Sequence, residues 1–160
     1  MGLFAITLRA RIRMPMNIPG HHGLEVMALF MLGRSISKIK FASTISSITA
    51  GLMIFFPFMG FSDPFMPVYY LLMGITIDSL YHIWKNKKMQ LLFLTIIGGL
   101  AYLIIPVSRI LIHSLSGYPF NSLLKFGYFV PTISHFLFGL AGGLLGAGLV
   151  ITLSKYFKKQ

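Results

Sequence analysis

The sequence predicts an all-α protein: a polytopic bundle of transmembrane helices with four clear spans and an irregular N-terminal segment. We expect five to six helical segments in one domain, residues 1–160. Two observations carry this prediction. Hydrophobic residues make up 56% of the chain and charged residues 11%, against about 25% charged residues in soluble domains. None of the apolar stretches alternates in polarity as the strands of a β-barrel do.

Four stretches approach the roughly 20 apolar residues that a transmembrane helix needs. They form the predicted four-span core within residues 41–160. Their ranges are 41–61, 66–84, 89–112 (which passes through Pro106) and 127–153.

The distribution of charge predicts an orientation. The chain has 14 Lys and Arg against three acids, a net charge of +11. Basic clusters lie at 34–40, 85–88 and 155–159, whereas the loops 62–65 and 113–124 contain no Lys or Arg. The positive-inside rule therefore places the basic loops and the C-terminus in the cytoplasm, with Lys125 as an exception. We predict an integral protein of a bacterial or archaeal inner (plasma) membrane, in contact with lipid and with no nucleic-acid partner.

The N-terminal segment, residues 1–40, does not fit a simple span. The stretch 14–33 is long enough, but it contains Pro15, Pro19 and Gly20. It is either a re-entrant or broken segment, or it follows a short first span and turns near the outer face. Irregular backbone at membrane depth persists where protein or water satisfies its polar groups, and transporters build binding sites there.

Polar residues in such surroundings are candidate ligands. His21, His22 and Glu25, with Asn17 nearby, suit a divalent metal such as zinc, nickel or cobalt, or a small organic ligand. The alternative is a helix start with Glu25 favoured in the first turn. Asp78 and His82 stand four residues apart and share one side of a helix. They either bind a ligand or stabilise the helix end beside Lys85.

Three further residues have open interpretations. Arg109 either attracts an anionic substrate or extends to lipid headgroups. His135 follows Pro131 by four residues and is expected to hydrogen-bond a backbone carbonyl. Asp63 precedes Pro64 and is expected to be a turn residue.

Small residues predict close helix packing in the last span. Gly139 and Gly143 are four residues apart, as are Gly142 and Gly146, a spacing that lets another helix approach closely. That helix belongs either to a partner subunit or to the same chain. The chain contains no GxSxG, HExxH or Walker A motif and no cysteine. We therefore predict no enzymatic activity and no resident cofactor.

Two segments resemble a known family. IPGHHGLEVMALFMLGRSISKIKFASTISSITAGLM (residues 18–53) has a proline-containing loop, a short apolar helix ending in Leu-Gly and a basic residue, and a helix rich in small residues. This pattern, with MGITIDSLYHI (residues 73–83), resembles the substrate-binding S component of energy-coupling factor (ECF) transporters. That family has a similar size and six helices. The alanine-rich docking motif and the N-terminal Met-His metal ligands of the family are not found.

The resemblance implies a function. S components bind vitamins or metal ions and dock onto a transmembrane coupling subunit with two ATPases. We accordingly predict a solute-binding subunit of an uptake transporter, with a vitamin-like molecule or a divalent metal as substrate. The alternative is a non-transporting membrane subunit that serves assembly of a larger complex. The predicted substrate-binding residues are Asn17, His21, His22, Glu25, Asp78, His82 and Arg109.

Overall fold

The computed structural model describes residues 1–11, 18–55, 63–84 and 90–157. In these ranges the chain forms eight helices and no strands, so the predicted all-α class is confirmed. Eight exceeds the predicted five to six. The helices are α1 (Gly2–Arg11), α2 (Gly23–Ile36), α3 (Ala42–Ile54), α4 (Met66–Ile83), α5 (Gln90–Tyr102), α6 (Ile104–Ser116), α7 (Asn121–Phe126) and α8 (Phe129–Phe157).

Within the described ranges, two segments are long and apolar enough to cross a membrane: Gln90–Ser116, which joins α5 and α6, and Phe129–Ser154 in α8. The four-span bundle is therefore not confirmed. Helix α3 has 13 residues, or about 20 Å at 1.5 Å per residue, which is short of the roughly 30 Å hydrocarbon core. Helix α4 has 18 residues, and its last turns carry Asp78 and His82. The structure does not describe residues 56–62 of the predicted first span.

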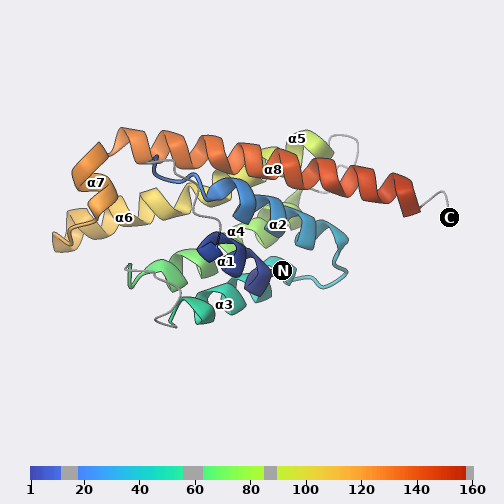
Figure 1. Ribbon diagram of the computed structural model, residues 1–160, viewed down its shortest axis with the longest axis horizontal. Coiled ribbons are helices and arrows are strands. Elements are labelled where there is room, and N and C mark those ends of the chain that lie inside the picture. The colour runs from blue at the N-terminus through green and yellow to red at the C-terminus, as the bar shows by residue number, and fades with distance from the viewer. Residues whose placement is uncertain (12–17, 56–62, 85–89, 158–160) are drawn as a thin grey trace.

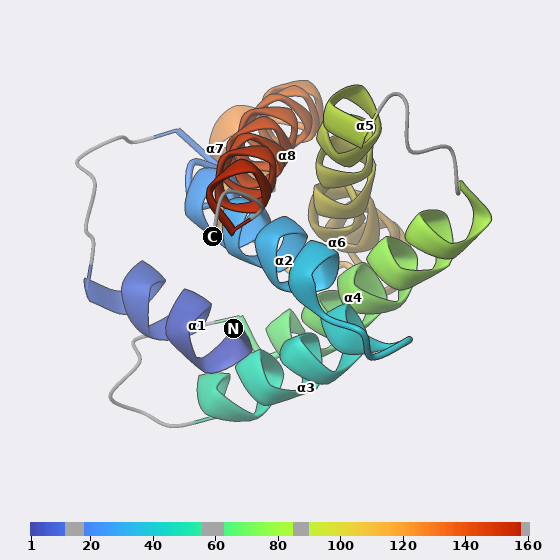
Figure 2. The ribbon, with the colours of Figure 1, turned by 90° about the vertical axis from the view of Figure 1, so that its right-hand side faces the viewer.

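The helices form two groups. In Figure 2, α8, α5 and α6 lie at the top, α1, α3 and α4 lie below, and α2 runs between the groups. Helix α8 packs against α2 and α5, and α3 packs against α4. Figure 1 shows α7 joining α6 to α8 at one end of the molecule. Large buried side chains fill the interior, including Phe30, Tyr69, Tyr70, Met73 and Leu94.

The N-terminal segment is more regular than predicted. Residues 2–11 and 23–36 are helical, and the irregular part that the structure describes runs from Ile18 to His22. Helix α1 has 10 residues, about 15 Å, so it is too short for a first span. Helix α2 is part of the core, because it packs against α8, α5, α1 and α3.

The glycines of α8 make close contacts inside the chain, as one of the two predicted alternatives requires, and these four positions are therefore not the predicted partner contacts. A Cβ on Gly139 or Gly143 would lie 2.6 Å from the carbonyl oxygen of Gly98 or Leu94 in α5. A Cβ on Gly142 would lie 2.5 Å from the carbonyl oxygen of Gly23, and one on Gly146 2.6 Å from that of Ala28. Helix α8 thus presents one pair of glycines to α5 and the other to α2.

The contrast between Gly139 and Gly148 tests this packing. Gly139→Ala places a methyl group against backbone, and we expect a loss of about 1–3 kcal/mol in stability, as for other overpacked sites. Gly148 has open space around its Cβ position, so Gly148→Ala should be neutral or stabilise the helix by up to about 1 kcal/mol. Thermal unfolding in detergent measures both. Equal melting temperatures for the two variants would contradict the packing described.

Candidate functional site

The turn before α2 is pressed against two aromatic rings, and glycine makes this contact possible. Gly20 has φ +85°, which favours glycine, and a Cβ there would lie 2.7 Å from Nδ1 of His135. A Cβ on Gly23 would lie 2.3 Å from the ring of Tyr102. The rings of Tyr102 and His135 are stacked, with centroids 5.0 Å apart. The absence of a side chain at these two glycines therefore lets the turn pack directly against α5 and α8.

Hydrogen bonds fix the protonation pattern of the histidine rings around this turn. Nδ1 of His21 lies 2.7 Å from the carbonyl oxygen of Ile18, and Nδ1 of His135 lies 2.6 Å from that of Pro131. A carbonyl oxygen only accepts, so each Nδ1 carries the proton and donates. The prediction that His135 bonds a backbone carbonyl is confirmed. Nδ1 of His22 pairs with Oε1 of Glu25 at 2.6 Å.

The structure does not gather His21, His22 and Glu25 into the predicted metal site, because no group of three or more His, Cys, Asp or Glu that could hold a metal ion occurs among the described residues. The three side chains make other contacts. Nδ1 of His22 hydrogen-bonds Oε1 of Glu25, and Nδ1 of His21 hydrogen-bonds the backbone carbonyl oxygen of Ile18. Asn17 lies outside the described residues.

Glu25 lies in the first turn of α2, as predicted, and is buried. Burial alone would raise the pKa of its carboxyl, but the hydrogen bond and charge of His22 outweigh this effect and lower the pKa below 4.5. Its second oxygen, Oε2, is buried and has no hydrogen-bond partner among the described residues. Glu25 therefore serves as the counter-group that orients His22.

The turn forms one wall of a cavity of about 140 Å³, which we call the histidine cavity. It collects side chains from the turn and from α4, α5, α6, α7 and α8. It brings together three of the predicted binding residues, His21, His22 and Arg109. Three polar residues were missed as binding candidates: Tyr102, Ser122 and His135. The described lining is Ile18, Pro19, Gly20, His21, His22, Met66, Tyr102, Ile105, Arg109, Ser122 and His135.

Arg109 is held by an internal counter-ion. Its Nε and Nη2 both donate to Oδ2 of Asp63, at 2.9 and 2.7 Å. Oδ1 of Asp63 accepts from the backbone N–H of Phe65 at 3.0 Å, which confirms Asp63 as a turn residue. The guanidinium lies 6.0 and 5.7 Å from the ring centres of Tyr69 and Phe120. Arg109 thus points into the protein, so its predicted alternative of extending to lipid headgroups is wrong in this conformation.

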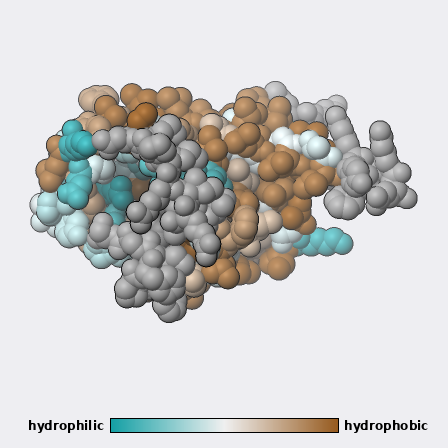
Figure 3. Space-filling view, viewed as in Figure 1, coloured by the Kyte–Doolittle hydropathy of each residue, from teal (hydrophilic) through white to brown (hydrophobic). Residues whose placement is uncertain are grey.

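A second cavity, of about 260 Å³, is also lined by Arg109, and we call it the loop cavity. Arg109 and Ser122 line both cavities. Hydrophilic side chains gather at the end of the molecule that holds α7, whereas apolar side chains cover much of the remaining described face in view (Figure 3). The lining of the loop cavity is Asp63, Arg109, Tyr118, Pro119, Phe120, Asn121 and Ser122.

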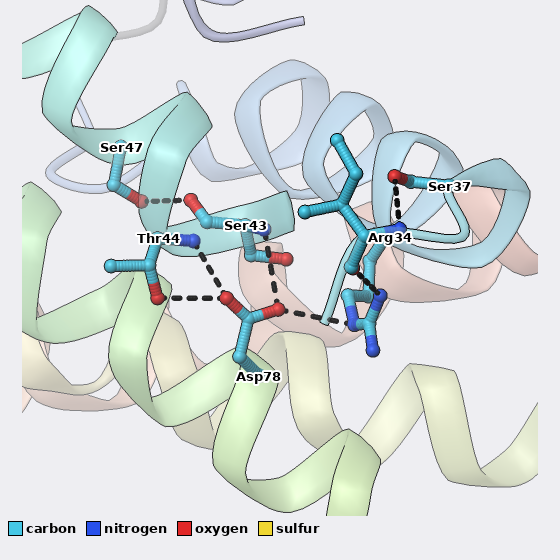
Figure 4. A network of polar contacts seen from close by, with 7 residues as sticks. Arg34, Ser37, Ser43, Thr44, Ser47 and Asp78 are labelled. Carbon is cyan, nitrogen blue, oxygen red and sulfur yellow. Dashed lines mark hydrogen bonds and ion pairs between the residues drawn. The ribbon is translucent and has the colours of Figure 1, made fainter. Parts of the chain in front are cut away.

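Asp78 lies outside both cavities and joins three helices. Its Oδ2 accepts from the backbone N–H and the hydroxyl of Thr44, at 2.8 and 2.7 Å. Its Oδ1 accepts from the backbone N–H of Ser43 at 3.2 Å and lies 3.1 Å from Nε of Arg34. Figure 4 shows Asp78 of α4 pointing at the start of α3 and at Arg34. Asp78 therefore caps α3 and pairs with Arg34.

The predicted partnership of Asp78 with His82 is wrong. Asp78 is buried, whereas His82 is exposed. Arg34, the first residue of the predicted basic loop 34–40, lies in the last turn of α2 and is buried. It donates to the carbonyl oxygen of Ile39 at 2.9 Å and lies 4.3 Å from the ring centre of Tyr81. The four-residue spacing correctly predicts that Asp78 and His82 lie on one side of α4. It does not predict that Asp78 is buried against α2 and α3 while His82 is exposed.

The chain matches no known protein-family model, no curated protein and no solved structure. The assignment of function consequently depends on the residues and cavities themselves.

Asp78 and His82 provide a matched pair of variants. Asp78→Ala leaves the Arg34 charge buried without its partner, and we expect a loss of about 3–5 kcal/mol in stability. His82→Ala changes an exposed side chain, so its effect should stay within about 0.5 kcal/mol. Unfolding in detergent measures the difference. Comparable losses for the two variants would show that Asp78 does not bind the helices together.

Glu25 makes stability depend on pH. Because its folded pKa lies below 4.5, its contribution is complete above that value and is lost as the pH falls through the folded pKa. We expect Glu25→Gln to melt below the wild type at neutral pH, with a gap that narrows at about pH 3. Melting curves across this range measure the gap. A gap that is constant or widens on acidification would contradict the His22–Glu25 pairing.

Proposed function

We propose that the protein is a membrane-embedded subunit that binds a small organic solute in the histidine cavity. The observation that carries this proposal is the cavity itself. In a chain that is 56% hydrophobic, it gathers imidazole, guanidinium and hydroxyl groups from separate segments around one partly open cavity. Concave sites with a few convergent polar groups are typical of small-molecule binding.

The two apolar segments Gln90–Ser116 and Phe129–Ser154 support membrane insertion. They also carry Arg109 and His135 of the cavity. The basic residues 155–159 follow the second segment, which favours a cytoplasmic C-terminus under the positive-inside rule. Since the sequence has no nucleotide-binding motif, uptake would draw its energy from partner subunits. An S-component-like role with a coupling subunit and ATPases meets this requirement.

The second candidate function is assembly of a larger membrane complex. It is favoured by α1 and α3, which are too short to span a bilayer and expose large apolar side chains. Contact with a partner subunit would cover these faces. The exposed residues are Leu3, Phe4, Ile45, Ile48, Leu52 and Phe55.

A ligand screen by thermal unfolding separates the two functions. We expect the purified protein in detergent to gain several degrees in melting temperature with one member of a panel of vitamins and small organic solutes, because a ligand that binds only the folded state stabilises it. His21→Ala with His22→Ala should remove the gain. His82→Ala is the matched control and should retain it, because His82 lies outside both cavities.

A different outcome would support the assembly function. If no solute shifts the melting temperature, and the protein co-purifies with a membrane partner that is not an ATPase module, the assembly function is correct and the solute-binding function is wrong.

A further inference from the structure

The described lining of the histidine cavity contains a guanidinium and no carboxylate. Among the described residues that line it, Arg109 is the one with a permanent charge, and none is acidic. Asp63 lines the loop cavity instead, and Glu25 lies behind His22, where it binds Nδ1 of that ring. Although Arg109 is paired with Asp63, its guanidinium has only N–H donors, so this wall can donate hydrogen bonds to an anion and offers no ligand to a metal ion at Arg109.

Arg109 retains hydrogen-bonding capacity toward such an anion. A guanidinium has five N–H donors, but Nε and Nη2 both bind the same oxygen of Asp63. Nη1 makes a long hydrogen bond of 3.4 Å to the hydroxyl of Ser122, and Nη2 a further contact of 3.7 Å to the sulfur of Met66. The Nη1 edge and the Ser122 hydroxyl, which both belong to the cavity wall, are placed to donate to one anionic group.

The imidazole of His21 can supply a hydrogen-bond acceptor. Nδ1 of His21 donates to the Ile18 carbonyl oxygen, so in the neutral ring Nε2 is the acceptor. Nδ1 of His22 is paired with the Glu25 carboxylate instead, so His21 is the acceptor. The cavity wall therefore combines donors for an anion with an acceptor for a hydroxyl. A volume of about 140 Å³ is that of roughly four or five water molecules in the liquid, enough for an anionic group and a few further atoms.

We propose that the histidine cavity binds a small hydroxylated organic anion, a carboxylate or a phosphate ester, with Arg109 and Ser122 holding the anionic group and His21 accepting from the hydroxyl. This proposal rests on the proposed solute-binding function and specifies its substrate class. The same chemistry occurs in a free solute, such as lactate or glycerol phosphate, and in the headgroup of phosphatidylglycerol.

Calorimetric titration of the full chain in a zwitterionic detergent tests the proposal with matched probes. Lactate and glycerol 1-phosphate carry both groups, propionate lacks the hydroxyl, and lactamide lacks the charge. We expect at least one of the first two to bind, and propionate and lactamide to bind at least tenfold more weakly, because charge-assisted hydrogen bonds are about twice as strong as neutral ones.

Three variants locate the binding. Arg109→Gln should weaken binding at least tenfold. Asp63→Asn removes the competing carboxylate and should strengthen binding by threefold or more, an effect that general unfolding cannot mimic. Lys125→Gln removes a positive charge from α7 without touching either cavity wall, and its affinity should stay within twofold of the wild type.

A second experiment uses nanodiscs of phosphatidylglycerol or phosphatidylcholine. It measures the melting temperature of the wild type and of Arg109→Gln, and the readout is the stabilisation that this substitution removes. Stabilisation by phosphatidylglycerol, with no binding of the free solutes, supports the anion site and overturns the solute-binding function. Equal affinity for lactate and lactamide overturns the anion site while the solute-binding function stands. The proposal is also overturned if none of the probes binds and the two lipids stabilise the protein equally.

Discussion

The direct contact of glycine backbone with neighbouring helices along α8 determines the rest of the structure. Gly139 and Gly143 admit α5, and Gly142 and Gly146 admit α2, at distances where any Cβ would meet a carbonyl oxygen. Between helices of a membrane protein, close van der Waals packing supplies much of the association energy, because lipid tails are as apolar as the side chains. The same contacts continue through Gly20 and Gly23, which bring the histidine turn against His135 and Tyr102. The histidine cavity forms beside this seam.

The few charged groups of the described interior are used in pairs at the two ends of α4. Before its first residue, Asp63 holds Arg109, and near its last turn Asp78 holds Arg34. The two pairs have different roles. Asp78 also caps α3 and leaves neither of its oxygens for a ligand. Asp63 directs a single oxygen to Arg109, and that arginine forms part of both cavity walls. Only the pair at the α7 end is therefore placed for binding.

The sequence predicted the helical class and part of the site, and the reasons for success and failure are physical. Apolar composition and the lack of alternation identify helices, but apolar length overestimates spans: α3 ends at Ile54, ahead of Pro57 in the sequence. His21, His22 and Arg109 were identified because charged or titratable groups are costly in apolar surroundings. Ser122 and Tyr102 carry no such signal, since a serine and a tyrosine are common in any helix. Their role depends on contacts between segments far apart in the chain. Asp78 was assigned to His82 by helical spacing, whereas its partners lie in α2 and α3.

The central claim is that the histidine turn faces a cavity that binds an anion at Arg109, and the absence of cysteine from the chain allows a direct measurement. A single cysteine at position 21 is modified with a negatively and with a positively charged methanethiosulfonate, and the ratio of rates is compared with that for a cysteine at the exposed position Ser114. The account predicts a ratio shifted toward the negative reagent at position 21, and loss of this shift in Arg109→Gln. An equal ratio at the two positions, or a shift toward the positive reagent, would contradict it.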